Sequence, residues 1–148
     1  MAMKTYFDFA ENDFRYFMDS HARGVVANAM AADAQEICEK YMKHLLNEYF
    51  DPETPEQDAD YSTVMRTHNL IKISRFMEEA LDFQLSSGTK SELRQINGYY
   101  FTARYPGDES IEVEKEDLEL CASAVTHCRA EIMAEIAKLE SQRKNENK

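Results

Sequence analysis

The chain has 148 residues and 43% of them are hydrophobic, so one domain with a proper core is expected. Glycine (4) and proline (3) are scarce, which favours long helices with few tight turns. With 28 acidic and 17 basic residues the formal net charge is −11, which argues against indiscriminate DNA coating and against docking on an anionic membrane.

Apolar residues at spacings of three and four predict two helices in the first third of the chain. The first covers residues 6–20 and breaks at Arg23-Gly24, and the second covers residues 25–49. The apolar stripe of the second helix is Val26, Met30, Ala34, Ile37, Tyr41 and Leu45. Residues 51–60 contain two prolines, five acids and no large apolar side chain, so a solvated loop is expected there.

The second half of the chain predicts two more long helices and one short helix. The third long helix covers residues 63–85, and SSGT (86–89) ends it through Gly88 and can cap the short helix at 91–96. The last helix covers residues 113–142, with apolar residues from Leu118 to Leu139. The expected fold is therefore an all-α, antiparallel up-and-down bundle of four long helices within residues 1–140, followed by a frayed tail at 141–148.

An aromatic crossover, NGYYFTARYPGD (97–108), separates the short helix from the last helix. Tyr99, Tyr100, Phe101 and Tyr105 are expected to cover the open end of the bundle. Arg104 would then project from a turn that Pro106-Gly107 stops. Two interpretations of Arg104 stay open: a salt bridge, to Glu39, Asp108 or Glu114, or contact with a bound anion.

Three motifs occur in a characteristic order: AQEICEKYMKHLL (34–46), THNLIKI (67–73) and YYFTARYPG (99–107). In this combination the chain resembles the HEPN domain family, a nucleotide-binding helical bundle of higher eukaryotes and prokaryotes. The resemblance covers roughly residues 5–140 and implies a homodimer, since family members usually pair through their helices. Many RNA-cutting members carry Arg, four to six residues and then His near the start of the last helix. Here the last helix has His127 before Arg129 and no such motif, and this departure from the family pattern argues against ribonuclease activity.

The strongest candidate site is a basic stripe on the third predicted helix, where His68, Lys72 and Arg75 share one face. These three residues, with Arg104 from the crossover, are predicted to bind phosphate, and Tyr100 could stack on a base. The alternative is a solvated polar face opposite the apolar stripe. No catalytic residue is predicted: Arg15 and His21, the one Arg-x5-His string, lie 600° apart on a helix and do not face the same way.

No cofactor or metal is predicted. Cys38, Cys121 and Cys128 form no CxxC pair, and Cys121 and Cys128 fall on an apolar stripe, as core thiols do. An odd cysteine count, no signal peptide and no membrane-spanning window favour a reduced, cytoplasmic setting.

Three hypotheses for the function follow. The first is binding of a nucleotide or RNA element without catalysis, beside a small nucleotidyltransferase-like partner in a toxin–antitoxin or stress module. The second is a metal-independent ribonuclease toxin of HEPN type with an unorthodox Arg and His pair. The third is a protein–protein interaction module that binds no nucleotide.

Overall fold

The computed structural model describes residues 2–147, and this part of the chain contains helices and no strand. The helices are α1 (Tyr6–Ala22), α2 (Asn28–Tyr49), α3 (Pro55–Arg66), α4 (Leu70–Leu81), α5 (Ser87–Ile96), α6 (Tyr99–Thr102) and α7 (Lys115–Glu146). The all-α class is thus confirmed. No helix within residues 2–147 combines the length and the apolar character needed to cross a bilayer.

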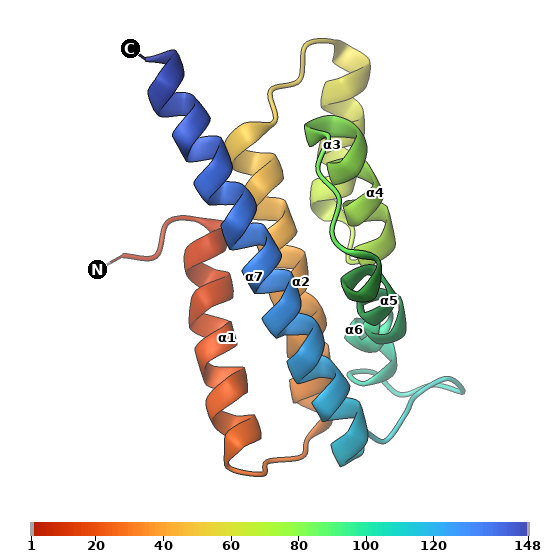
Figure 1. Cartoon of the computed structure of the whole chain (residues 1–148). Coiled ribbons are helices and arrows are strands. Elements are labelled where there is room, and N and C mark those ends of the chain that lie inside the picture. Colours follow the sequence, from red (N-terminus) through yellow and green to blue (C-terminus); the bar gives the residue numbers. More distant parts are fainter. Residues whose placement is uncertain (1, 148) are drawn as a thin grey trace.

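The three longest helices, α1, α2 and α7, lie side by side, and the shorter helices cover the remaining side of α2 (Figure 1). α2 and α7 run in the same direction. Near the start of α2, the Asn28 side chain bonds the backbone of Ile111 and Val113, just before α7; at its end, Tyr49 bonds Glu140 near the end of α7. An up-and-down order of four long helices gives the second and the last helix the same direction, because residues 50–114 return the chain to the end where α2 began. The expected four-helix arrangement as a whole is not confirmed, since the third long helix is divided into α3 and α4.

Residues 51–60, expected as a loop, belong largely to α3. Thr54 begins this helix by accepting a hydrogen bond from the Gln57 N–H (3.1 Å), and Pro55 occupies the first turn, where a missing N–H costs nothing. The acidic residues Glu56 and Asp58 lie in the same turn and complement the helix dipole. The stretch is as exposed as its composition indicates, but strong helix-start signals make it a solvated helix.

The single helix expected over residues 63–85 is broken between Arg66 and Leu70. Asn69 caps the new helix α4, accepting hydrogen bonds from the N–H groups of Ile71 and Lys72 (3.0 and 3.1 Å). α4 then ends at Leu81, where Asp82 takes a left-handed conformation (φ 50°). Consequently the next helix begins earlier than expected and contains Gly88, which therefore ends no helix; Ser86 caps it, and Thr89 N–H donates to the Ser86 hydroxyl.

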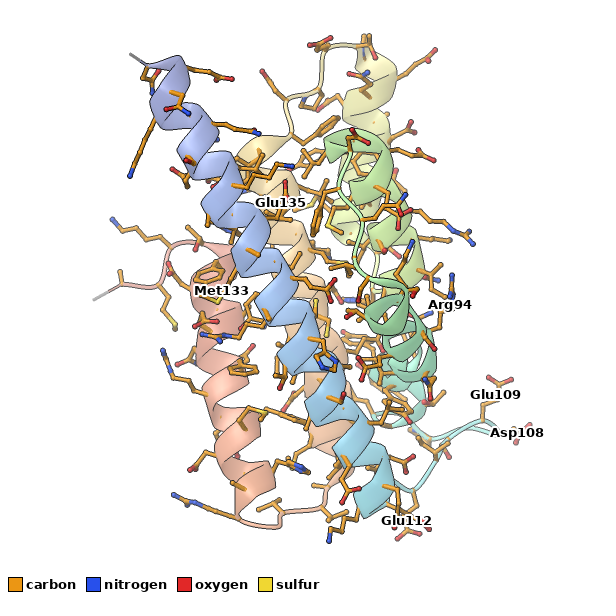
Figure 2. The ribbon with its side chains drawn as sticks, in the orientation of Figure 1. Arg94, Asp108, Glu109, Glu112, Met133 and Glu135 are labelled. Atoms are coloured by element: carbon orange, nitrogen blue, oxygen red, sulfur yellow. The ribbon has the colours of Figure 1, made fainter. Side chains whose placement is uncertain are left out.

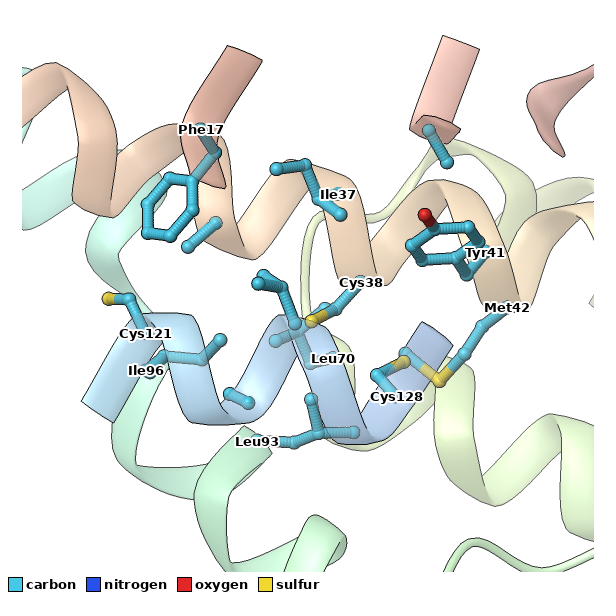
Figure 3. Packing of buried hydrophobic residues seen from close by; sticks show 14 of the residues in the cluster. Phe17, Ile37, Cys38, Tyr41, Met42, Leu70, Leu93, Ile96, Cys121 and Cys128 are labelled. Carbon is cyan, nitrogen blue, oxygen red and sulfur yellow. The ribbon is translucent and has the colours of Figure 1, made fainter. Parts of the chain in front are cut away.

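One apolar core fills the space between the helices (Figure 3). Residues of the predicted stripes supply half of its 26 buried residues: Met30, Ala34, Ile37, Tyr41, Leu45, Leu70, Ile73, Met77, Leu118, Cys121, Val125, Cys128 and Ile132. Burial raises the pKa of the Cys121 thiol to about 12, so it stays protonated, as a core thiol does. Val26 was expected in the stripe of α2 but lies at the surface, with 47% of its area exposed.

The aromatic crossover does not close the bundle as expected. Its first residues form the short helix α6, and Phe101 and Tyr105 are 57% and 51% exposed, while Tyr99 packs against the core. The loop before α7 carries Asp108 and Glu109 away from the helices (Figure 2). The aromatic side chains of Phe101 and Tyr105 therefore remain exposed to solvent at and just after α6.

The tail expected to fray at 141–148 is helical through Glu146; Lys148 lies outside the described residues. Arg143 holds it. Its guanidinium lies 4.3 Å from the Tyr49 ring centroid and donates to the Glu48 carbonyl (2.6 Å).

Candidate functional site

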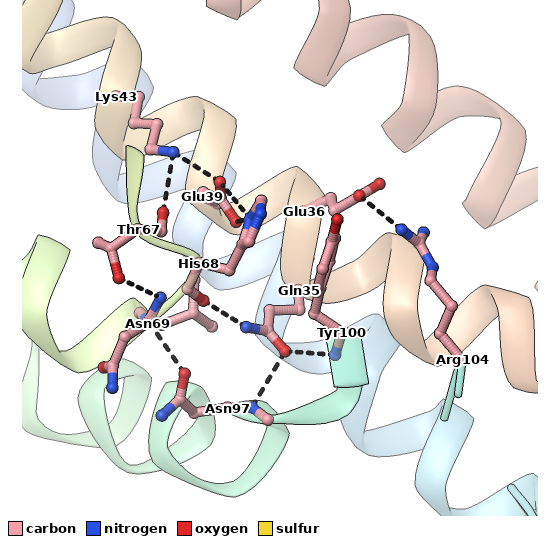
Figure 4. A network of polar contacts seen from close by, with 12 residues as sticks. Gln35, Glu36, Glu39, Lys43, Thr67, His68, Asn69, Asn97, Tyr100 and Arg104 are labelled. Atoms are coloured by element: carbon pink, nitrogen blue, oxygen red, sulfur yellow. Dashed lines mark hydrogen bonds and ion pairs between the residues drawn. The ribbon is translucent and has the colours of Figure 1, made fainter. Parts of the chain in front are cut away.

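A buried glutamine of α2 joins the two irregular segments on either side of α4 and α5. Gln35 is 1% exposed, and its amide donates to the His68 carbonyl (2.5 Å). Its side-chain oxygen accepts from the N–H groups of Gly98 (3.0 Å) and Tyr100 (2.8 Å). Three otherwise unpaired backbone groups are thus satisfied by one side chain, which fixes the start of α6 next to the 67–69 segment (Figure 4).

Next to this segment, the buried residues Glu39 and Lys43 form an ion cluster with His68, whose side chain is 36% exposed. We call these three residues the buried ion cluster. Glu39 and Lys43 are 5% and 4% exposed, and the Lys43 ammonium lies 2.6 Å from the Glu39 carboxylate and 3.0 Å from the Thr67 carbonyl. His68 Nδ1 lies 3.1 and 3.2 Å from the two carboxylate oxygens. Since a carboxylate only accepts, Nδ1 carries a proton here, which leaves Nε2 as the acceptor in the neutral ring.

Tyr100 lies between His68 and Arg104 (Figure 4). Its ring stacks on the imidazole with centroids 3.9 Å apart and 14° between the planes, and the Arg104 guanidinium lies 4.5 Å from its centroid. Both faces of the ring are therefore covered, and no face remains on which a base could stack. The expected stacking role of Tyr100 does not fit this geometry.

Arg104 forms ion pairs with Glu36 (3.2 Å) and Asp33 (3.9 Å) on α2, so the salt-bridge interpretation holds with partners other than those expected. Desolvation works against the charge of Arg104, but the neighbouring Glu36 outweighs it and raises the pKa of the guanidinium. Burial and the charge of Glu36 also raise the pKa of Asp33. Arg104 thus contacts the ring of Tyr100 and not His68 itself, and Asp33 and Glu36 hold its guanidinium on the side of that ring away from His68.

On the outer side of the 67–69 segment lies an open groove of about 370 Å³, which we call the Phe101 groove. It is lined chiefly by Arg66, His68, Asn69, Lys72, Asn97 and Phe101. Arg66 and Lys72 contribute two positive charges, and no carboxylate is among the lining residues. The arrangement provides an exposed aromatic ring beside a cationic wall.

Of the five residues predicted to bind phosphate or a base, the structure brings His68 and Lys72 together in the Phe101 groove, with Tyr100 against the His68 ring. Arg75 lies one turn further along α4 and lines a separate, smaller groove between α4 and α5. Sequence reasoning missed Phe101 and Gln35. Gln35 belongs to the motif AQEICEKYMKHLL, but its burial and its bridging contacts depend on other segments and cannot be predicted from the motif itself.

The other histidine and arginine candidates are engaged elsewhere. His127 Nδ1 lies 2.7 Å from Glu92, and Arg129 makes a two-pronged contact with Glu11 (2.6 and 3.1 Å). His21 stacks on Phe17. Within the described residues no group of three or more His, Cys, Asp or Glu side chains could hold a metal ion.

Comparison with known proteins places the chain within one family. The family model described as the HEPN domain matches residues 3–139, nearly the whole chain. No curated protein and no solved structure gives a significant match.

Proposed function

The chain belongs to the HEPN domain family, and from that premise we propose that it binds a nucleotide or an RNA element without cleaving it. The observation that carries the proposal is the Phe101 groove, which has two cations and no carboxylate in its lining although the whole chain has a net charge of −11. In this proposal a base stacks on Phe101, and Arg66 and Lys72 meet the phosphate.

His68 and Tyr100 have a positioning role in this proposal. Gln35 and the buried ion cluster hold the His68–Tyr100 stack, and the stack packs against Phe101, whose centroid is 5.0 Å from that of Tyr100. Arg104 supports the same ring from the far side. A ligand would therefore meet a preformed wall, which reduces the ordering cost of binding.

The non-catalytic part of the proposal is supported by the placement of the candidate bases and cations. RNA cleavage needs a base near the 2′-hydroxyl and a cation at the scissile phosphate. Arg129 and His127 are held by carboxylates of different helices, Glu11 on α1 and Glu92 on α5. Incubation of the purified protein with tRNA and total RNA tests this point. Cleavage that is lost in His68→Ala or in His21→Ala would favour the ribonuclease hypothesis instead.

Calorimetric titration with nucleoside monophosphates tests the binding site. Lys72→Ala and Phe101→Ala are expected to weaken binding about tenfold each, because one removes a charge and the other the stacking ring. Tyr105→Ala is the matched control, since Tyr105 is similarly exposed (51% against 57%) but does not line the Phe101 groove. Equal affinities in all four proteins would refute the site. If no nucleotide binds or raises the melting temperature, the interaction-module hypothesis takes its place.

Two further elements of the proposal rest mainly on the family: a homodimer and a nucleotidyltransferase-like partner in a toxin–antitoxin or stress module. Phe9 and Tyr16, seven residues apart on α1, are 44% and 67% exposed, and they offer an apolar face for a second copy. Light scattering is expected to give twice the monomer mass, and Tyr16→Glu to lower it. Co-expression with a nucleotidyltransferase encoded by a neighbouring gene tests the partner.

A further inference from the structure

The Phe101 groove has two neighbouring hollows. On one side, the smaller groove of about 70 Å³ between α4 and α5 begins at Leu70 and Ile71, directly beside the Asn69 and Lys72 that line the Phe101 groove. On the other side, Phe101 itself lines both its own groove and a hollow that extends to Tyr105 and Pro106. The three hollows therefore follow one another from α5 across the start of α4 to the exposed aromatics of α6.

The α4–α5 end of this series of hollows is cationic. The groove is lined by Arg75, Lys90 and Arg94 with one acid, Glu78, which pairs with Lys90 (2.9 Å). Two unopposed positive charges remain. Arg75 and Arg94 are exposed, and Arg94 lies on the outer side of α5 (Figure 2).

These arginines belong to a group of unpaired cations that lines the two grooves. Other cations of the described residues also form no ion pair, but they line neither groove: Lys4, Arg15, Lys115, Lys138 and Lys144. Within residues 2–147, carboxylates pair with Arg23, Lys40, Lys43, Lys90, Arg104, Arg129 and Arg143. Arg66, Lys72, Arg75 and Arg94 have no carboxylate within 4.0 Å in this described part, and all four line the two adjoining grooves. In a protein with 28 acidic residues, four free cations in a row leave a local positive strip available to a polyanion.

The size of the α4–α5 groove and its donors limit what it can hold. With about 70 Å³ it has room for a phosphate group but is much smaller than the Phe101 groove. The first amides of α4 are already bonded, by Asn69 and by the side chain of Asn97 (2.9 Å from Leu70 N), so the anion contacts must come from side chains. Lys72 and Arg75 are separated by a rise of about 4.5 Å, comparable to the roughly 3.4 Å advance between phosphates in a stacked strand.

We propose that Arg75 and Arg94 form a second phosphate site in the α4–α5 groove, and that the ligand of this face is a single-stranded nucleic acid several nucleotides long. This inference rests on the function proposed above, because the Phe101 groove takes one nucleotide of the same strand. The strand lies with its backbone on the cationic strip and with bases toward Phe101 and Tyr105. Groove cations that follow a backbone and aromatic rings that stack bases are the combination by which proteins bind single strands with little sequence preference.

The test compares ligands of different length. Binding of a labelled uridine hexanucleotide is measured by fluorescence anisotropy at several salt concentrations, and uridine monophosphate is titrated by calorimetry. The hexanucleotide is expected to bind wild type at least about tenfold more tightly than the monophosphate. The double variant Arg75→Ala/Arg94→Ala is expected to lose this advantage while it binds the monophosphate as wild type does. Each single-strand phosphate contact contributes about 0.7 to the log–log salt slope, so the variant's slope falls by about 1.4.

Lys138→Ala/Lys144→Ala is the matched control, because it removes the same charge from two exposed lysines of α7. If both double variants bind the hexanucleotide equally weakly, the loss comes from the change in net charge, and the second site is overturned. A hexanucleotide that binds no better than the monophosphate would overturn it too, and in either case the nucleotide site at Phe101 would stand. Failure of both ligands to bind would remove the proposed function itself. All the substituted side chains are exposed, so the melting temperatures of both variants are expected to stay close to wild type.

Discussion

The buried ion cluster makes a quantitative prediction about Lys43. Replacing Lys43 by methionine keeps the side-chain volume but removes the ammonium 2.6 Å from Glu39 and the hydrogen bond to the Thr67 carbonyl. Glu39, only 5% exposed, is then left as a buried charge without its cation. Breaking one partner of a buried pair typically costs about 3–5 kcal/mol, so we expect Lys43→Met to lower the free energy of unfolding by about 3 kcal/mol at pH 8.

Lys40 provides a matched control on the same helix. Its ammonium lies 2.6 Å from Asp13, the same separation as in the Lys43–Glu39 pair, but the two side chains are 28% and 33% exposed. An ion pair that water reaches contributes at most about 1 kcal/mol, so Lys40→Met should cost less than that. Urea denaturation followed by circular dichroism measures both. Similar losses for the two variants would refute the argument from burial.

A double variant tests whether the loss comes from the unpaired carboxylate. If Lys43→Met is unstable because Glu39 is left buried without its cation, the double variant Glu39→Gln/Lys43→Met should recover part of the lost free energy of unfolding. A double variant as unstable as Lys43→Met would contradict this account.

Three more substitutions test other parts of the structure. Gln35→Leu leaves three backbone groups without their partner, so we expect it to lower the free energy of unfolding in urea by about 3 kcal/mol. Gln95→Leu is the control, because it removes only an exposed 3.3 Å hydrogen bond to a carbonyl of its own helix. It should lower the free energy of unfolding by less than about 0.5 kcal/mol. Burial lowers the pKa of His44, so the folded state loses stability as the pH falls below about 6.5. His44→Gln should therefore make the difference between the unfolding free energies at about pH 7.5 and about pH 5.5 smaller. An unchanged difference would exclude His44 as its source. Asp82→Gly should raise the melting temperature, because Asp82 has φ 50°, and Asp82→Val should lower it; the opposite order would show that Asp82 is held there by interactions worth more than the strain.

The apolar periodicity predicted the core well because it is a local property of each helix. The stripes of α2 and α7 came out buried with few exceptions. The buried Glu39–Lys43 pair is not a local property in this sense, because its burial depends on the 67–69 segment that lies over it. The same segment explains why the break before α4 was not predicted. Asn69 is a residue type that often caps helices, but the segment is also held by Gln35 and Lys43, which bond its carbonyls from another helix.

The candidate site was predicted only in part, for a similar reason. His68 and Lys72 lie on one side of the same groove because both belong to the start of α4. The sequence YYF does not indicate which aromatic residue of the crossover is exposed to solvent. That outcome depends on the helical conformation of α6 and on the position at which Gln35 anchors it. That anchor turns Tyr100 inward between His68 and Arg104 and leaves Phe101 outside.

The parallel alignment of α2 and α7 has a consequence for how the chain acquires its structure. α1 and α2 are joined by a short connection and can pair as soon as both exist, whereas α7 docks on α2 only after the whole excursion of residues 50–114 has been closed into a loop. Contacts of such long sequence separation slow folding. We therefore expect the α1–α2 hairpin to form first and α7 to dock last, which would complete the packing of the helices that line the groove.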